Sequence, residues 1–126
     1  MSEKKLPHHH HDETEQMFDH MPNPEAFTAT AEIFGLMGDV TRLRLFWLLC
    51  HCEECVQNLS VLMGLSSPAL SHHLKILKMC RLITSRREGR EVYYRAADTL
   101  QANALHPMIE QMAALTCPES ARDLYP

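Results

Sequence analysis

Apolar positions recur at helical spacing through most of the chain, most clearly over residues 66–78. Leu70, Leu74 and Leu77 lie four and three residues apart, so they share one face of a helix. A serine at position 66 or 67 can cap the start of this helix. The other face carries hydroxyl, imidazole and ammonium groups, which suit DNA base edges and phosphates but also occur on ordinary solvated helices.

The same spacing predicts four more helices, over residues 24–37, 41–50, 55–63 and 98–115. Gly64 follows the third of these, at the position where a helix end favours a left-handed residue. A short helix, a glycine turn and a second helix with a polar outer face form the helix-turn-helix pattern, although a plain helical hairpin would share it.

The period changes from that of a helix to that of a strand after the helix-turn-helix. β-branched and aromatic residues at 82–84 and 92–94 flank a charged turn that contains Gly89, which predicts a β-hairpin. The expected fold is therefore mainly α with a small β-hairpin, a winged helix-turn-helix with the order α-α-α-α-β-β-α. The basic side chains near the hairpin tip suit DNA phosphates: Arg86, Arg87 and Arg90.

The last predicted helix carries more apolar surface than so small a domain can cover. Its apolar stripe consists of Leu100, Ala104, Met108, Met112 and Leu115. We therefore expect a homodimer formed through the first and last helices. We expect a disordered, acidic and histidine-rich arm over residues 1–24, a winged helix-turn-helix domain with its dimerisation helices over 25–116, and a C-terminal tail over 117–126.

Charge is distributed unevenly along a chain whose net charge is −4. Residues 1–40 carry eight acidic and two basic side chains, whereas residues 71–95 carry seven basic and two acidic ones. A basic half on an acidic protein is the electrostatic footprint of a nucleic-acid partner. No apolar run approaches the roughly 18 residues of a membrane span, and the N-terminus lacks a signal-peptide core. We therefore expect a cytoplasmic protein without a membrane partner.

The five cysteines are expected to be thiols, metal ligands or core residues in a reducing compartment, rather than disulfides. Two of them occur in the segment Cys52-Glu53-Glu54-Cys55, where two thiolates can reach one soft ion. His51 and Cys50 are further donors beside this pair. The alternative is that Cys50 is a core residue and Cys52 an incidental thiol.

Four segments resemble the ArsR/SmtB family of bacterial winged helix-turn-helix repressors. Residues 38–45 are similar to the family's Asp-Pro-x-Arg-x-x-Leu segment, with Val40 where proline is usual. Residues 53–59, Glu-Glu-Cys-Val-Gln-Asn-Leu, resemble its metal box. Residues 70–77, Leu-Ser-His-His-Leu-Lys-Ile-Leu, resemble its recognition helix, and 87–94, Arg-Glu-Gly-Arg-Glu-Val-Tyr-Tyr, resemble its wing.

The resemblance, which covers about residues 34–114, implies a homodimeric repressor. Such a protein binds an inverted-repeat operator in double-stranded DNA and releases it when an inducer binds. The DNA-contacting residues that it implies are Ser67, Ser71, His72, His73, Lys75, Arg86, Arg87 and Arg90. A scaffold of the same fold that senses nothing is the alternative. An enzyme is not expected, because the chain has no His-Glu-x-x-His, no glycine-rich phosphate loop and no nucleophile elbow.

The inducer implied by the resemblance is a soft metal or metalloid ion, such as Zn(II), Cd(II), Pb(II) or As(III). Cys55 matches the key cysteine of the family's metal box, so the expected ligands are Cys52, Cys55 and His51. The residues that could instead contribute to this or another site are Cys50, His8, His9, His10, His11, Asp98, His106, Glu110, Cys80 and Cys117.

Other sensing chemistries stay open. The family's zinc site on the last helix is incomplete here, because Asp98 matches its first ligand but Leu100, Gln111 and Ala114 occupy the other positions. Paired thiols could sense oxidants or reactive sulfur. Cys117, followed by a proline, resembles a haem-regulatory dipeptide, which makes haem a further candidate.

Overall fold

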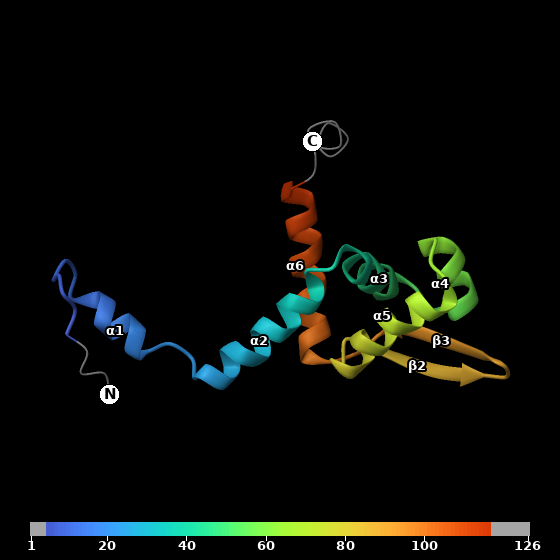
Figure 1. Ribbon diagram of the computed structural model, residues 1–126, viewed down its shortest axis with the longest axis horizontal. Helices are drawn as coiled ribbons and strands as arrows, with labels where there is room; N and C mark the ends of the chain where they lie inside the picture. Colours follow the sequence, from blue (N-terminus) through green and yellow to red (C-terminus); the bar gives the residue numbers. More distant parts are fainter. Residues whose placement is uncertain (1–4, 117–126) are drawn as a thin grey trace. The chain divides into compact units, whose positions relative to one another are not determined.

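The computed structural model describes residues 5–116, which form six helices and a three-stranded sheet (Figure 1). The elements, in chain order, are α1 (Glu13–Asp19), α2 (Pro24–Met37), α3 (Val40–His51), β1 (Glu54–Cys55), α4 (Val56–Met63), α5 (Ser67–Met79), β2 (Ile83–Glu88), β3 (Glu91–Ala96) and α6 (Leu100–Thr116). This order confirms the winged helix-turn-helix prediction and adds α1 and β1 to it. None of the helices within 5–116 has the length and apolar character needed to cross a membrane.

The chain divides into two units, one up to Phe34 and one from Gly35 onward. In the first unit, the arm that the sequence predicts to be disordered carries the seven-residue helix α1, none of whose residues is buried. The side chain of Asn23 accepts a hydrogen bond from the backbone N–H of Ala26 at 2.9 Å and so caps the start of α2.

In the second unit, the helix ends lie where the local chemistry places them. Asp39 caps α3 by accepting the backbone N–H of Arg42 at 2.9 Å, and this hydrogen bond lowers the pKa of the Asp39 carboxyl. Ser66 caps α5 through the N–H of Ala69 at 3.3 Å. Gly64 ends α4 with φ at +65°, a left-handed conformation that glycine adopts without a Cβ clash. The turn between α4 and α5 is therefore set by the residues that predict it.

The core lies where α3, α4 and α5 meet the sheet. Leu70, Leu74 and Leu77 are all buried, as their shared helix face predicts. The largest fully buried side chains around them are Leu45, Phe46, Leu49, Leu59 and Leu82. α6 contributes Ala102 and Leu105 to this core. The same packing that closes the core therefore leaves the opposite face of α5 exposed.

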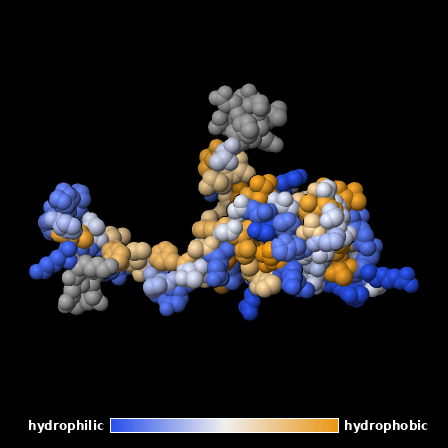
Figure 2. Space-filling model, in the orientation of Figure 1, coloured by the Kyte–Doolittle hydropathy of each residue, from blue (hydrophilic) through white to orange (hydrophobic). Residues whose placement is uncertain are grey.

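The sheet is antiparallel, with strand order β1-β3-β2. β2 and β3 form the predicted hairpin, whose turn contains Gly89 at a φ of +63°. β1 adds a short third strand, in which Cys55 lies opposite Tyr93 of β3. The hairpin extends away from the helices (Figure 1), and its tip is hydrophilic (Figure 2).

Candidate DNA-binding face and candidate metal centre

The outer face of α5 is polar and exposed. Four of the residues expected to contact DNA lie on it: Ser67, Ser71, His72 and Lys75. At the end of the helix, Nζ of Lys78 donates to Oγ of Ser85 at 2.7 Å and so ties α5 to β2. This face presents hydroxyl, imidazole and ammonium groups from a helix whose position is held by its buried leucines.

His73 lies on a different side of α5 from these four residues. It is half-buried, and its Nδ1 is 3.2 Å from Nη1 of Arg42 on α3. Arg42 in turn donates from Nε to the backbone oxygen of Leu36 at 3.0 Å. Consecutive helical residues are about 100° apart around the axis, so His72 and His73 cannot both point outward. The structure thus directs His73 toward α3, whereas the motif groups it with the DNA-contacting residues.

The three arginines of the hairpin also differ from one another. Arg87 and Arg90 are exposed at the tip and take part in none of the ion pairs within residues 5–116. Arg86 is paired with Glu53, through Nη2–Oε1 at 2.7 Å and Nε–Oε2 at 3.0 Å, and also with Glu88. The two tip arginines are therefore available to an anion, and Arg86 is already engaged.

Arg86 connects the hairpin to the segment between α3 and β1. Its guanidinium lies 4.7 Å from the ring centroid of Tyr93, the residue opposite it on β3. The hydrogen bonds from Arg86 hold the pKa of the Glu53 carboxyl below its ordinary value. Arg86 thus orients the wing relative to the helices.

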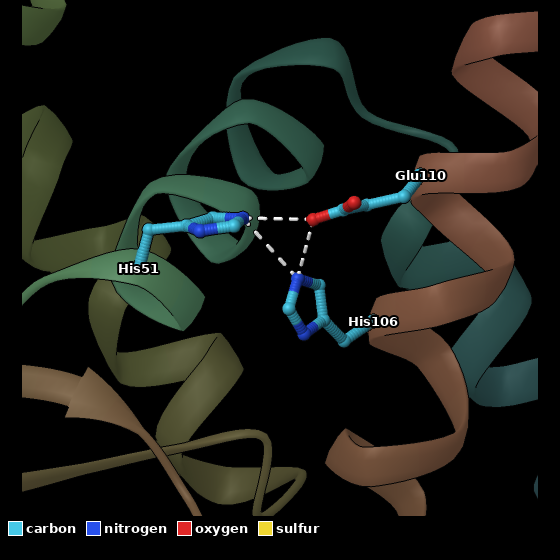
Figure 3. A group of neighbouring side chains, drawn as sticks. All are labelled: His51, His106 and Glu110. Carbon is cyan, nitrogen blue, oxygen red and sulfur yellow. Dashed lines mark hydrogen bonds and ion pairs between the residues drawn. The ribbon is translucent and has the colours of Figure 1, made fainter.

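A second polar group forms where the end of α3 meets α6. Oε1 of Glu110 lies 2.8 Å from Nε2 of His51 and 2.7 Å from Nε2 of His106, and the two Nε2 atoms are 3.2 Å apart (Figure 3). Within residues 5–116, it is the one group of three or more histidine, cysteine or acidic side chains whose ligand atoms all lie within 4.8 Å of one another. The hydrogen bond from His106, followed by that from His51, lowers the pKa of the Glu110 carboxyl.

The cysteines that the sequence predicts as ligands are not members of this group. Cys52 is exposed at the end of α3, where its Sγ donates to the backbone oxygen of Leu48 at 3.4 Å. Cys55 is only 5% exposed in β1. Cys50 is half-buried, and burial, followed by the charge of Glu110, raises the pKa of its thiol to about 11. The Cys52–Cys55 site therefore remains a prediction from spacing.

The other candidate ligands are dispersed. His8, His9, His10 and His11 are exposed in the first unit, where Nε2 of His9 lies 2.8 Å from Oδ1 of Asp12. Asp98 accepts a hydrogen bond from Nδ2 of Asn103 at 2.9 Å. Cys80 is half-buried at the end of α5, and Cys117 lies outside the described residues. None of these side chains joins a ligand group of three within residues 5–116.

The sequence identifies each of the three side chains in the polar group as a candidate ligand, but it does not predict that they lie together. His51 belongs to the predicted thiol site because it precedes Cys52, and His106 and Glu110 are recognised only as a pair four residues apart. Their meeting depends on contacts between α3 and α6, which the helical pattern of either element does not specify.

The fold and the polar face of α5 define a winged helix-turn-helix protein. Its residues 39–85 match the model described as "Bacterial regulatory protein, arsR family". The chain is 32% identical to the arsenical resistance operon repressor of Escherichia coli over 61% of this chain and 67% of that relative. The chain belongs to the ArsR family, which confirms the resemblance carried by its motifs.

Two further matches agree with this assignment. A transcriptional repressor SmtB homolog from Synechocystis is 40% identical over 65% of this chain, which spans 62% of that relative's length. HlyU from Vibrio cholerae has a TM-score of 0.65 and 27% identity, covering 76% of this chain and all of that structure. Both curated relatives are named as transcriptional repressors rather than enzymes.

Proposed function

We propose that this protein is a homodimeric transcriptional repressor that places α5 in the major groove of its operator and the hairpin tip on the DNA backbone. The observation that carries the proposal is the capped helix α5, which buries three leucines and leaves Ser71, His72 and Lys75 exposed beside a basic hairpin. Hydroxyl and imidazole groups can read base edges, and the charged side chains can bind phosphates.

The exposed apolar surface of α6 supports the homodimer. Four of its large side chains are exposed in the single chain, namely Leu100, Met108, Met112 and Leu115. Hydrophobic residues are visible along this helix in Figure 2. A second copy that covers them would place two recognition helices on successive major grooves, with half-sites about 34 Å apart. The operator is therefore expected to be an inverted repeat.

The role of α5 is tested by replacing His72 with alanine. After selection of an operator from random duplexes, this variant should lose about 1–3 kcal/mol of the preference for that operator over a scrambled duplex. Fluorescence anisotropy with both duplexes measures the preference. Gln101→Ala, at an exposed position on α6, is the control and should match the wild type. An unchanged preference in both His72→Ala and Ser71→Ala would contradict the proposed reading of DNA by α5.

The inducer is proposed to be a soft metal or metalloid ion that binds Cys52 and Cys55. Two features support this. The thiols flank the short segment between α3 and α4, the first helix of the helix-turn-helix, and the Escherichia coli relative is named for arsenical resistance. Glu53, between the two cysteines, holds Arg86 of the wing. An ion that rearranged this segment would therefore move the wing relative to α5.

Substitution of Cys52 by serine tests the inducer site without disturbing the buried Cys55. The Cys52→Ser variant should bind the operator like the wild type but resist release by As(III) or Cd(II), with at least a tenfold higher ion concentration needed, because one of two thiolates is lost. Cys80→Ala serves as the control. Release of Cys52→Ser at the wild-type concentration of ion would contradict the site. Release by an oxidant or a polysulfide alone would identify the thiols as redox sensors instead.

A further inference from the structure

We infer that His51, His106 and Glu110 form a second ion site, which binds a divalent transition-metal ion of borderline softness such as Zn²⁺ or Co²⁺. Two imidazole nitrogens and one carboxylate oxygen are a common ligand set for such ions, whereas As(III) and Cd(II) prefer thiolates. The site differs from the proposed thiol site in its donors, because no cysteine is among its three members. His51, which the sequence groups with Cys52 and Cys55, belongs here to a site shared with α6.

The spacing of the donor atoms fits one ion. Ligands at about 2.0–2.1 Å from a tetrahedral ion are about 3.3 Å apart. The two Nε2 atoms are already separated by 3.2 Å. The distances from Oε1 of Glu110, 2.7 and 2.8 Å, are those of hydrogen bonds and would lengthen by roughly half an ångström, which rotation of the carboxylate allows. Figure 3 shows all three groups converging on one point between the helices.

The ligands are held in place by the two helices that carry them. His106 and Glu110 are four residues apart, so they project from the same face of α6. His51 lies between two rings, with its centroid 4.2 Å from that of Trp47 and 4.9 Å from that of His106. Side chains that are oriented before the ion arrives lose less conformational entropy when they bind it.

The three side chains lie at the protein surface, next to a small cavity. A cavity of about 200 Å³ adjoins His106 and is lined also by Cys50 and Asp98. A water molecule occupies about 30 Å³ in the liquid, so this cavity has room for ordered water beside His106. The glutamate and histidines themselves are partly exposed, which leaves the ion a path of entry.

An ion at this site would join α3 to α6. α3 packs against α5 and β3, and α6 carries the apolar face that we assign to the dimer. The bound ion would therefore couple the position of the recognition helix to the dimer interface. This consequence for DNA rests on the proposed function, but binding of the ion does not.

Cobalt titration of the reduced full-length protein tests the site directly. Co²⁺ bound by imidazole and carboxylate should give ligand-field absorption without a thiolate-to-metal charge-transfer band. We expect Zn²⁺ to displace it. The titration is repeated on a variant with alanine at His8, His9, His10 and His11, so that ions bound by the arm are counted separately.

His106→Ala should lose one equivalent of Co²⁺ per chain, or weaken its binding by at least about 100-fold, because a ligand is removed. Gln111→Ala, on the same helix, and Cys52→Ser should both keep that equivalent. In a Cys52→Ser background, which removes a ligand of the proposed thiol site, the melting temperature should rise with Zn²⁺ when His106 is present and should not rise when His106→Ala is added. A cooperative melting transition in the double variant shows that it is folded.

Retention of the full Co²⁺ equivalent by both His106→Ala and His51→Ala would overturn the inference and leave a hydrogen-bonded surface cluster. A thiolate charge-transfer band for the first equivalent would also overturn it. Operator binding is measured in a separate experiment, so loss of the ion site and failure of DNA recognition give different results.

Discussion

Replacement of Leu59 by alanine is expected to lower the free energy of unfolding by about 2–5 kcal/mol. Leu59 is fully buried on α4, the helix that packs against α5 and against β1 and β3. Alanine would remove apolar area from the core and leave a cavity that neighbouring leucines fill only in part. Because α4 positions the start of α5, the variant should also lose operator binding at temperatures where the wild type is stable.

Urea denaturation followed by circular dichroism measures the effect on stability. Leu62→Ala is the matched control, since it makes the same substitution on the same helix at a side chain that is 62% exposed. Its effect should stay within about 0.5 kcal/mol. Both variants are compared with the wild type at two protein concentrations, which separates changes in folding from changes in dimerisation. Equal losses from the two substitutions would contradict the assignment of Leu59 to the core.

The parts of the fold that the sequence predicts are those set by local chemistry. The leucine spacing in α5, its serine cap and the left-handed Gly64 each depend on a few neighbouring residues, and all three are found in the structure. The sequence does not predict β1, because two residues cannot show the alternation that marks a strand. Its pairing with β3 depends on residues nearly 40 positions away.

The grouping of side chains in the candidate metal centre also depends on contacts that sequence position does not predict. Adjacency along the chain places His51 with Cys52, whereas folding brings it to His106, 55 residues later. Likewise, the motif joins His73 to His72, and the turn of the helix separates them. The residue types indicate which chemistry is available, but tertiary contacts decide which side chains lie together.

The three wing arginines differ in how far their charge is free to bind DNA phosphates. In β2, side chains alternate between faces, so Arg86 and Arg87 point to opposite sides. Arg86 lies opposite Tyr93 and pairs with Glu53, whereas Arg87 and Arg90 have no ion pair within residues 5–116. A cation that is already neutralised by carboxylates releases few DNA counterions when it meets a phosphate. The three arginines are therefore expected to contribute unequally.

The double variant Arg87→Ala, Arg90→Ala should bind the operator more weakly and with a flatter dependence on salt. In a homodimer it removes four positive charges, and each phosphate contact contributes about 0.9 to the slope of log K against log salt, so the slope should fall by about 3–4. The matched control, Glu53→Ala with Arg86→Ala, removes one acid and one base and leaves the net charge unchanged. Its slope should stay within about 1 of the wild type, because the wing is loosened without losing a free cation. Anisotropy titrations over a range of salt concentrations measure both slopes. If the control flattened the slope as much as the tip variant did, Arg86 would be a phosphate contact and the separation of roles drawn from its ion pairs would be wrong.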